Sequence, residues 1–326
     1  MDAIVLAGGY ATRLWPITKH RPKMLLPIGE ETVIDHLFSE LEADKRVETV
    51  YVSTNERFAE TFREHIAASP FEKPRVSVEE TEEEDEKFGV VGALAQLIDR
   101  ENIGDDTLVI AGDNLISFDV SEFVDFFEQE GTPVLAAYDV GSYDRASQYG
   151  IVDLDGDRVV GFEEKPDEPA STLASIACYG FPAEALDRLE EYLADDNNPD
   201  EPGWFIQWLV GREDVFAFTF DEAWYDIGTP ESYLEAVAWH LGGDSYIHPD
   251  ATIENTEIGR NVHVMDGAHL NGVTAERSVI FPDVALTDCE LRETIIDEST
   301  QVEGINLAGA LIGAHTKING DDTDGE

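Results

Sequence analysis

A stretch near the amino terminus gathers basic residues and contains no acidic residue. It covers residues 3–29 and holds Arg13, Lys19, Arg21 and Lys23. With 70 acidic residues in a chain of 326, a stretch of this length would carry roughly 6 of them by composition alone. A strongly anionic protein that binds an anion needs a local reversal of its electric field. The sequence therefore predicts an anion-binding site that includes this stretch.

Two glycines, Gly8 and Gly9, follow the apolar run Ile4–Leu6 after a single alanine in the same stretch. Glycine allows a tight turn, and backbone N–H groups in such a turn can face a phosphate at the carboxyl end of a strand. No Gly-Lys-Ser/Thr follows, so the turn is not a Walker A loop, and Arg13 stands where a dinucleotide fingerprint has its third glycine. A bare Gly-Gly turn is usually structural, but with Thr12 and Arg13 attached it indicates phosphate binding.

A carboxylate and a lysine further along the chain also stand where phosphate chemistry could use them. The apolar run 108–111 is typical of a buried strand and continues into Gly-Asp, which places Asp113 at the ligand-binding edge of a parallel sheet. Lys165 follows Glu163 and Glu164 and is one of only seven lysines in the chain. A lone Gly-Asp is usually a turn, and two acids beside a lysine usually form a solvated patch. Their wider sequence context therefore has to decide between the two interpretations.

That context is a resemblance to a known family. The segment LAGGYATRLWPIT (residues 6–18), followed by PKMLLP (residues 22–27), resembles the signature of the sugar-1-phosphate nucleotidylyltransferases, the NDP-sugar pyrophosphorylases. The resemblance continues at intervals to about Ala238. It implies an enzyme that joins a nucleoside triphosphate to a sugar 1-phosphate and releases pyrophosphate. A sugar phosphate oxygen would attack the α-phosphorus in line, with catalysis supplied by positioning and charge neutralisation.

The resemblance implies roles for the charged residues at the reacting centre. Arg13 would hold the departing pyrophosphate and Lys23 would reach the phosphates, because arginine suits forked phosphate contacts and lysine a point contact. Asp113 and Asp226, the latter in the motif WYDIGTP, would form a Mg²⁺ pair, since magnesium prefers few carboxylates together with phosphate oxygens and water. The structural alternative is that Asp226 caps the helix beginning near residue 230, but Thr229 is the better-placed N-cap.

The resemblance also implies a sugar site. The motif EEKP at residues 163–166 resembles the family's sugar-binding motif, in which Lys165 would pair with the sugar's phosphate. Of the two acids, spacing from Lys165 favours Glu164 over Glu163 as the acceptor of sugar hydroxyls. Gly150 would touch the sugar through its backbone, and Tyr179 stands in a strand that often flanks the sugar.

The nucleobase is the part of the substrate that the sequence leaves open. Phe88–Ala93 resembles the family's glycine-rich base-binding loop, but valines replace the usual small polar pair. Glu79 or Glu80 would read the base, because a carboxylate accepts from N3–H of uracil or thymine and equally from the two donors of guanine. We expect glucose 1-phosphate with UTP or dTTP, and mannose-1-phosphate guanylyltransferase is the alternative. The expected nucleotide-binding residues are Leu6, Gly8, Gly9, Thr12, Glu79 and Gly89.

Short β-rich runs alternate with helical patterns over the first two thirds of the chain. This alternation predicts βαβ units and a Rossmann-like α/β fold, with a mainly parallel mixed sheet covered by helices on both faces. Such a sheet holds ligands beyond the carboxyl ends of its strands. Strands are expected at 3–7, 47–53, 76–78, 107–111 and 134–138, helices at 33–41, 58–67, 91–98, 120–128 and 183–193, and a hairpin at 151–162.

After His240 aliphatic residues recur every five or six positions, a period that neither a helix nor an alternating strand has. Hexapeptide repeats of a parallel β-helix have it, and an antiparallel sandwich is the less regular alternative. The resemblance implies the left-handed β-helix of many family members, expected at 245–320 between a catalytic domain at 1–240 and an acidic tail at 321–326. The recurring residues are Ile247, Ile253, Ile258, Val264, Leu270, Ile280, Leu286, Leu291, Ile296, Val302, Leu307, Ile312 and Ile318.

Two other functions compete with this interpretation. A hexapeptide acyltransferase would use the β-helix as its active domain, with His248, His263, His269 or His315 as the catalytic base, but such enzymes usually have more coils. A non-catalytic regulatory relative would lack part of the charged set at the reacting centre. That set is intact here, which argues against the regulatory alternative.

Composition limits the partners and the compartment. The 21 basic and 70 acidic residues give a net charge of −49, which excludes binding to nucleic acid or an anionic membrane through bulk charge. At 42% hydrophobic residues the chain can still bury a core, and its self-repulsion would be screened at molar salt, where the Debye length is about 3 Å. We therefore expect a cytoplasmic, homo-oligomeric enzyme of a halophile, without a signal peptide. Cys178 and Cys289 are expected to be buried thiols.

Overall fold

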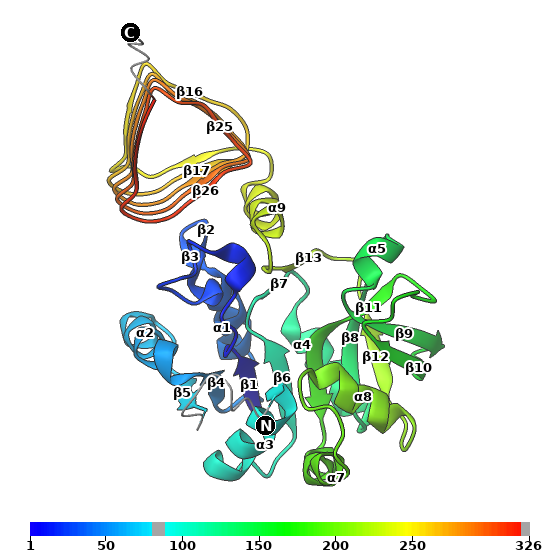
Figure 1. Ribbon diagram of the computed structural model, residues 1–326. Helices are drawn as coiled ribbons and strands as arrows, with labels where there is room; N and C mark the ends of the chain where they lie inside the picture. Colours follow the sequence, from blue (N-terminus) through cyan, green and yellow to red (C-terminus); the bar gives the residue numbers. More distant parts are fainter. Residues whose placement is uncertain (80–88, 321–326) are drawn as a thin grey trace. The chain divides into compact units, whose positions relative to one another are not determined.

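The computed structural model describes residues 1–79 and 89–320 of the chain (Figure 1). Contacts divide the chain into two compact units. The first joins Met1–Gly9 to Ile34–Trp224, and the second joins Tyr10–Val33 to the chain from Tyr225 onwards. The basic segment 10–33 thus groups with the carboxyl-terminal part of the chain. Within the described ranges, no helix has the length and apolar character needed to cross a membrane.

Within the described residues, a nine-stranded mixed sheet forms the centre of the first unit (Figure 1). Its first four strands are parallel, with β1 between β4 and β6 and with β5 outside β4. Then β11 runs antiparallel between β6 and β8, and β9 and β10 form the predicted hairpin. The strands, in their order across the sheet, are β5 (Pro74–Val78), β4 (Val50–Thr54), β1 (Asp2–Leu6), β6 (Thr107–Ala111), β11 (Leu173–Phe181), β8 (Val134–Asp139), β12 (Phe216–Thr219), β10 (Arg158–Glu164) and β9 (Gly150–Asp155).

Helices cover both faces of this sheet, as the sequence predicts. Neighbouring residues of β11 show the two sides: Tyr179 belongs to a buried cluster with Leu94, Leu97 and Phe205, whereas Gly180 lies against Phe127. The cluster residues come from α3 and α8 and Phe127 comes from α4. The helices are α1 (Val33–Ala43), α2 (Glu56–Ala68), α3 (Gly89–Glu101), α4 (Val120–Glu130), α5 (Tyr143–Ala146), α6 (Ala183–Leu186), α7 (Arg188–Ala194) and α8 (Pro202–Val210).

Several elements differ from the prediction. The helix expected at 183–193 is two helices, α6 and α7, which are separated at Asp187, the C-cap of the first and the N-cap of the second. Helix α8 was not predicted, since apolar residues surround most of it and leave no amphipathic period. Strand β11 was not among the strands expected from the apolar pattern, although the resemblance implies a strand at Tyr179, and it makes the sheet less parallel than expected. The two cysteines are free and buried, as expected.

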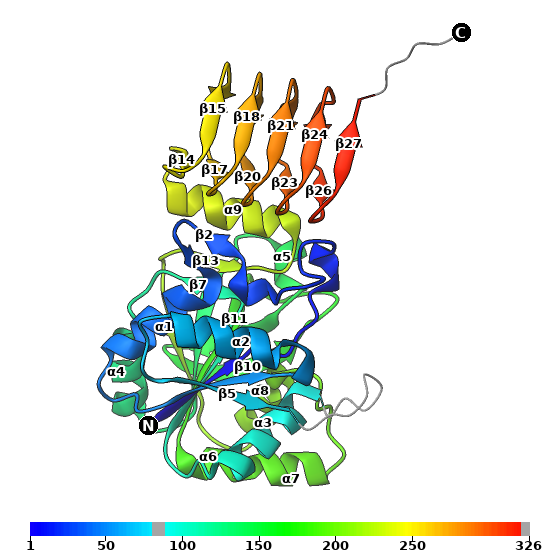
Figure 2. The ribbon, with the colours of Figure 1, turned by 90° about the vertical axis from the view of Figure 1, so that its left-hand side faces the viewer.

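The second unit contains a parallel β-helix, which confirms the interpretation of the aliphatic repeat (Figures 1 and 2). Successive coils pair in register, so that Val264, Ile280, Ile296 and Ile312 stack in one ladder. The first sheet has strands β14 (Tyr246–Ile247), β17 (Val262–Val264), β20 (Ser278–Ile280), β23 (Ile295–Ile296) and β26 (Leu311–Ile312). The second has β15 (Thr252–Glu254), β18 (His269–Asn271), β21 (Ala285–Thr287), β24 (Gln301–Glu303) and β27 (Lys317–Asn319), and the third has β16 (Glu257–Ile258), β19 (Thr274–Glu276), β22 (Glu290–Arg292) and β25 (Leu307–Ala308).

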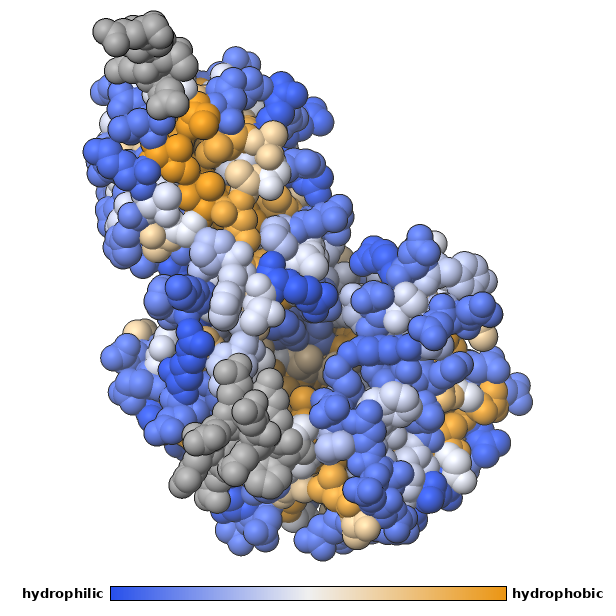
Figure 3. All heavy atoms as spheres, in the orientation of Figure 1, coloured by the Kyte–Doolittle hydropathy of each residue, from blue (hydrophilic) through white to orange (hydrophobic). Residues whose placement is uncertain are grey.

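Each middle coil buries its aliphatic residues between two neighbouring coils, whereas the last described coil has a neighbour on one side. Its Leu307, Leu311, Ile312 and Ile318 are consequently only half-buried. Figure 3 shows hydrophobic atoms gathered over one end of the β-helix.

Helix α9 (Pro230–Leu241) precedes the β-helix in the second unit, and β13 (Trp224–Asp226) leads into it. Thr229 is the N-cap of α9 and forms a capping box with Ser232, as its position predicts. The segment 10–33 adds two short 3₁₀ turns, η1 (Thr12–Leu14) and η2 (Lys23–Leu25), and the small hairpin of β2 (Pro27–Ile28) and β3 (Glu31–Thr32).

Candidate functional site

The turn at Gly8 and Gly9 lies at the carboxyl ends of parallel strands. Leu6, the last residue of β1, pairs with both β4 and β6, and its carbonyl accepts from the N–H of Gly112 at 2.9 Å. The side-chain amide of Asn55 donates to the Gly8 carbonyl at 2.8 Å. Asn55 also caps α2, so it ties the turn to a helix amino terminus. These bonds hold the turn at the ligand-binding edge of the sheet.

Glu79 follows β5 and reaches this turn. A Cβ atom on Gly8 would lie 2.4 Å from Oε1 of Glu79, so glycine leaves the space that the carboxylate occupies. The hydroxyl of Ser53 donates to the same oxygen at 3.4 Å, and burial raises the pKa of Glu79. The structure thus brings three predicted nucleotide-binding residues, Leu6, Gly8 and Glu79, to one edge. Glu80, the alternative to Glu79, lies outside the described residues.

Asp113 follows β6 at the same edge of the sheet and is half-buried. The next residue, Asn114 in β7 (Asn114–Ile116), is buried, and its side chain bonds to residues of β11 and β13. Its amide donates to the carbonyl of Ile176, and its oxygen accepts from Nε1 of Trp224 at 3.2 Å. Asn114 was not among the predicted residues, although it directly follows one of them.

Glu164 is a carboxylate in a tight and nearly dry position. Its residue is 8% exposed, and its carboxylate accepts no hydrogen bond from any residue in the described ranges. Burial raises the pKa of Glu164 to about 7, and this effect outweighs the neighbouring charge of Lys165. A Cβ atom on Gly203 would lie 1.7 Å from its Oε2, and one on Gly150 would lie 2.7 Å from the same atom. A buried carboxylate framed by glycines can accept hydrogen bonds from a hydroxylated ligand.

Lys165, the next residue, is exposed and has a left-handed backbone with φ of +47°. Its Nζ pairs with the carboxylate of Glu201, the residue that precedes α8. The Gln207 side chain on α8 accepts from the N–H of Glu164 at 3.0 Å. Helix α8 therefore holds both residues of the predicted sugar motif through Glu201, Gly203 and Gln207.

Tyr179 lies deeper than a ligand-contacting residue would be expected to lie. It is 3% exposed and belongs to the core cluster of the first unit. Burial, together with the charge of Glu164, raises the pKa of its hydroxyl. Gly150 is also buried, because it packs against the Phe162 ring and the Glu164 carboxylate. The structure thus places Tyr179 in the core of the first unit and Gly150 against the Glu164 carboxylate.

Arg13, Thr12, Lys23 and Asp226 belong to the second unit. Arg13 and Asp226 meet at Gly228: a Cβ atom there would lie 3.3 Å from Nη2 of Arg13 and 3.4 Å from Oδ1 of Asp226. Thr12 and Arg13 are exposed in η1, and Lys23 opens η2, half-buried. The Arg13 guanidinium and the Asp226 carboxylate thus both lie beside the buried Gly228.

Gly89 is the first residue of α3 and has a φ of +68°. A Cβ atom on it would lie 2.3 Å from the carbonyl oxygen of Pro199, which accepts from the N–H of Val91 at 2.9 Å. The close approach to Pro199 and the positive φ both require glycine. Phe88, the first residue of the predicted base-binding loop, lies outside the described residues.

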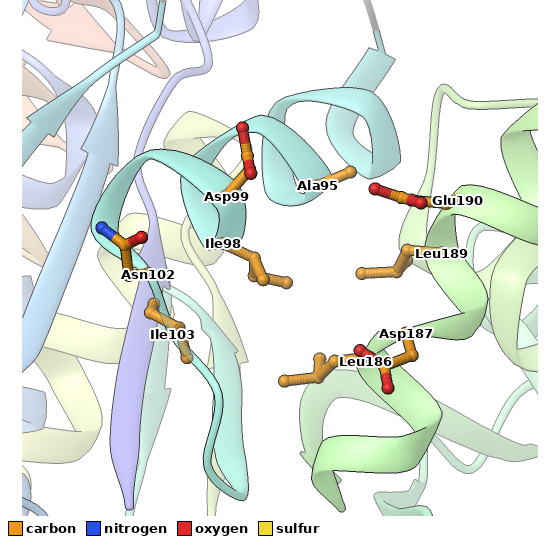
Figure 4. A pocket seen from close by; sticks show the side chains of 9 residues that line it. All are labelled: Ala95, Ile98, Asp99, Asn102, Ile103, Leu186, Asp187, Leu189 and Glu190. Carbon is orange, nitrogen blue, oxygen red and sulfur yellow. The ribbon is translucent and has the colours of Figure 1, made fainter.

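A pocket between α3 and α7 does not include any predicted site residue (Figure 4). Ile98, Ile103, Leu186 and Leu189 form its apolar floor, and Asp99, Asn102, Asp187 and Glu190 surround it. An acidic rim is the ordinary condition of the surface in a chain with a net charge of −49.

The residues that hold the sugar motif escaped the sequence analysis. Gly203 and Gln207 lie in α8 and Glu201 directly precedes it, and the mostly apolar composition of this helix conceals it. The signal that could have found them is Pro202 at the start of the apolar run 202–210, because proline is favoured at the first position of a helix.

Comparison with known proteins connects these residues to a family. The family model described as "Nucleotidyl transferase" matches residues 2–241. A Sulfolobus acidocaldarius protein, named provisionally as a mannose-1-phosphate guanyltransferase, is 31% identical over 72% of this chain, and the chain spans 61% of its length. A glucose-1-phosphate adenylyltransferase of Mycoplasma mobile is 29% identical over 91% of this chain and 84% of its own length.

A solved structure supports the same fold. A protein from Bacillus anthracis, named provisionally as a glucose-1-phosphate thymidylyltransferase, superposes with a TM-score of 0.64 at 24% identity. The match covers 74% of this chain and 95% of that one. The family match over 2–241 confirms the resemblance carried by the segments at 6–18 and 22–27. The chain belongs to the nucleotidyl transferase family.

Proposed function

We propose that the chain transfers a nucleotidyl group from a nucleoside triphosphate to a sugar 1-phosphate and releases pyrophosphate. The observation that carries this proposal is the pair Glu164 and Lys165. A buried carboxylate with a pKa of about 7 and no hydrogen-bond partner in the described ranges stands directly beside an exposed lysine. One can accept from hydroxyl groups and the other can pair with a phosphate, which are the two recognition elements of a sugar phosphate.

The nucleotide would occupy the edge formed by Leu6, Gly8, Gly9 and Glu79. The N–H groups of the turn would face the phosphates, while the Glu79 carboxylate would accept from the base. Thr12 and Gly89 would complete this part of the site. Its backbone groups are already held by Asn55 and Gly112, so binding would require little reorganisation.

Charge neutralisation would come from the basic side chains. Arg13 would hold the departing pyrophosphate through its forked N–H groups, and Lys23 would reach the phosphates at the reacting centre. Lys165 would hold the attacking sugar phosphate. Each of these groups stabilises charge that spreads over phosphate oxygens as the α-phosphorus changes partners.

Asp113 and Asp226 would hold Mg²⁺. Asp113 stands at the edge of the sheet that bears Gly8, and Asp226 stands beside Arg13. Each is a carboxylate next to a phosphate-binding segment, and carboxylates with phosphate oxygens and water are the donor set that Mg²⁺ prefers. When bound, the ion would neutralise charge on the triphosphate.

For the substrates, we propose glucose 1-phosphate with UTP or dTTP. The alternative is mannose 1-phosphate with GTP, because the Glu79 carboxylate could equally accept from the two donors of guanine. The names of the relatives span guanyl and adenylyl transfer, so all four bases belong in the test. We assign catalysis to residues 1–240. For the β-helix at 245–320 we propose a left-handed coil and a role in self-association.

A halophilic origin remains the explanation that we propose for the net charge of −49. The acyltransferase alternative loses one of its candidate bases, because His263 is 1% exposed within the β-helix. His248, His269 and His315 remain more accessible than His263.

The test is a matrix of nucleoside triphosphates against hexose 1-phosphates with Mg²⁺ at molar KCl, scored by pyrophosphate release. We expect one nucleotide and one sugar to dominate. Asp113→Ala should abolish release while leaving the unfolding midpoint unchanged, and Asp99→Ala, an acid on the surface of α3, serves as the matched control. If the folded protein released pyrophosphate with no combination of nucleotide and sugar, the result would contradict the proposal and favour the regulatory alternative.

A further inference from the structure

Three successive coils of the β-helix carry different residues at the same corner position. Phe281, Asp297 and Gly313 each follow directly on a rung of the ladder Ile280, Ile296 and Ile312. The N–H of Phe281 donates to Ile296 at 3.0 Å, and that of Asp297 donates to Ile312 at 2.9 Å. The three therefore occupy equivalent positions in successive coils, whose strands β20, β23 and β26 stack side by side in Figure 2. We call these three residues the corner ladder.

Two members of the corner ladder hold Arg21 of segment 10–33. Nη2 of Arg21 donates to Oδ1 of Asp297 at 2.9 Å and lies 3.0 Å from Oε2 of Glu298. The guanidinium carbon lies 4.9 Å from the centre of the Phe281 ring. Both pair members are sheltered, since the side chain of Arg21 is 20% exposed and that of Asp297 is 4% exposed. Removing either side chain would leave the other as an uncompensated buried charge, which lowers the free energy of unfolding.

The third member accepts Pro16. A Cβ atom on Gly313 would lie 2.8 Å from Cβ and Cγ of Pro16, so the coil needs glycine where the proline ring approaches it. Two tyrosine hydroxyl groups hold the later part of segment 10–33. Tyr233 of α9 donates to the Pro27 carbonyl at 2.8 Å, and Tyr246 of β14 donates to Glu30 at 2.8 Å.

The segment held in this way carries the basic groups to which we assign the triphosphate. Arg21 stands two residues before Lys23 and eight after Arg13. Pro22 is buried and fixes its own φ, so displacement of Arg21 would be passed to η2, which begins at Lys23. Thr18 secures the other end of the segment by donating to the Ala11 carbonyl at 2.8 Å.

We infer that the corner ladder positions the triphosphate-binding segment, with Arg21 as a positioning residue that acts through Arg13 and Lys23. The β-helix would then contribute to nucleotide binding without touching the nucleotide. This inference rests on the proposed function for the identity of the ligand. The placement of segment 10–33 on the corner ladder, in contrast, can be measured independently of turnover.

The experiment compares Arg21→Gln, Asp297→Asn and their double variant with Arg292→Gln. Arg292 pairs with Glu290 within the β-helix at 2.8 Å, so its variant removes an ion pair of the same unit away from the corner ladder. Turnover is measured with the nucleotide and sugar that the wild type prefers. Backbone hydrogen exchange is followed over residues 10–33, and the unfolding midpoint is recorded for every variant.

Arg21→Gln and Asp297→Asn should each raise KM for the nucleotide about tenfold, because a small misplacement of phosphate-binding groups is costly. KM for the sugar phosphate should stay unchanged, and exchange over 10–33 should accelerate. The double variant should resemble Arg21→Gln, since the two residues act as one pair. Arg21→Lys, which keeps the charge but not the planar fork, should fall between the wild type and Arg21→Gln.

Three results would overturn the inference. One is unchanged exchange over 10–33 in Arg21→Gln, which would mean that the corner ladder does not hold the segment. The second is faster exchange with an unchanged KM for the nucleotide, and the third is an equal rise of this KM in Arg292→Gln. If the wild type itself releases no pyrophosphate, the proposed function fails, and the exchange data still decide whether Arg21 holds the segment.

Discussion

Gly203 and Glu164 occupy adjoining space so closely that a methyl group on the glycine would lie 1.7 Å from Oε2 of the carboxylate. Gly203→Ala should therefore displace Glu164 and raise KM for the sugar phosphate by about tenfold or more. KM for the nucleotide should change little. Steady-state kinetics with each substrate varied in turn would measure both effects.

Gly211→Ala provides the matched control for Gly203→Ala. Gly211 ends the same helix, and a Cβ atom on it would make only an ordinary contact of 3.7 Å with the Trp208 carbonyl. An equal loss of sugar phosphate affinity in both variants would show that α8 as a whole, rather than the space beside Glu164, determines the effect.

Ionisation of Glu164 should make stability depend on pH. Its pKa is raised from 4.5 to about 7, so the folded chain keeps a proton that the unfolded chain loses, and stability falls as pH rises through this range. The full cost above pH 7 is on the order of 3 kcal/mol. Glu164→Gln should thus be no more stable than the wild type near pH 4.5 and more stable at pH 8, as measured by urea unfolding.

The same titration should appear in sugar binding. Glu164 accepts hydrogen bonds best as a carboxylate, so the affinity for the sugar phosphate should rise as pH increases through about 7. Titration calorimetry between pH 6 and 8 would follow it. A pH-independent affinity in the wild type would argue against contact between Glu164 and the sugar.

Gly8→Ala should weaken nucleotide binding, because its methyl group would lie 2.4 Å from Oε1 of Glu79. We expect KM for the nucleotide to rise about tenfold, with KM for the sugar phosphate unchanged. Gly104→Ala is the control, since nothing lies within 4 Å of a Cβ atom there. If Gly8→Ala behaved like Gly104→Ala, Glu79 would have no role in placing the nucleotide.

His263 should make the β-helix sensitive to acid. It is buried in β17, and burial lowers its pKa from 6.5 to about 4. The unfolded chain therefore binds a proton that the folded chain refuses, so stability falls as pH drops from 6.5 towards 4. His263→Phe should lose less stability than the wild type between pH 7 and 5, measured by urea unfolding at each pH. His269→Gln, on the exposed side of β18, should behave like the wild type.

Local patterns predicted most of the first unit because its strands and helices keep their own periods. The runs that became β1 and β6, for example, needed only apolar content and glycine boundaries to be found. The local pattern missed helix α8 and the extent of strand β11 because their surroundings decide their structure. Strand β11 is buried between two strands, and α8 is apolar on most sides. Among the site residues, Glu164 and Lys165 could be named from their motif. Glu201, Gly203 and Gln207 could not, since only the fold brings them to that motif.

The regular spacing of the corner ladder has a consequence for how the carboxyl-terminal part of such a chain can change in length. Ile280, Ile296 and Ile312 are separated by whole coils, and each coil carries its own corner residue. Deleting a few residues within a coil would move every later side chain to a different sheet of the β-helix. Adding complete coils beyond Gly313 would instead leave Phe281 and Asp297 in contact with Arg21.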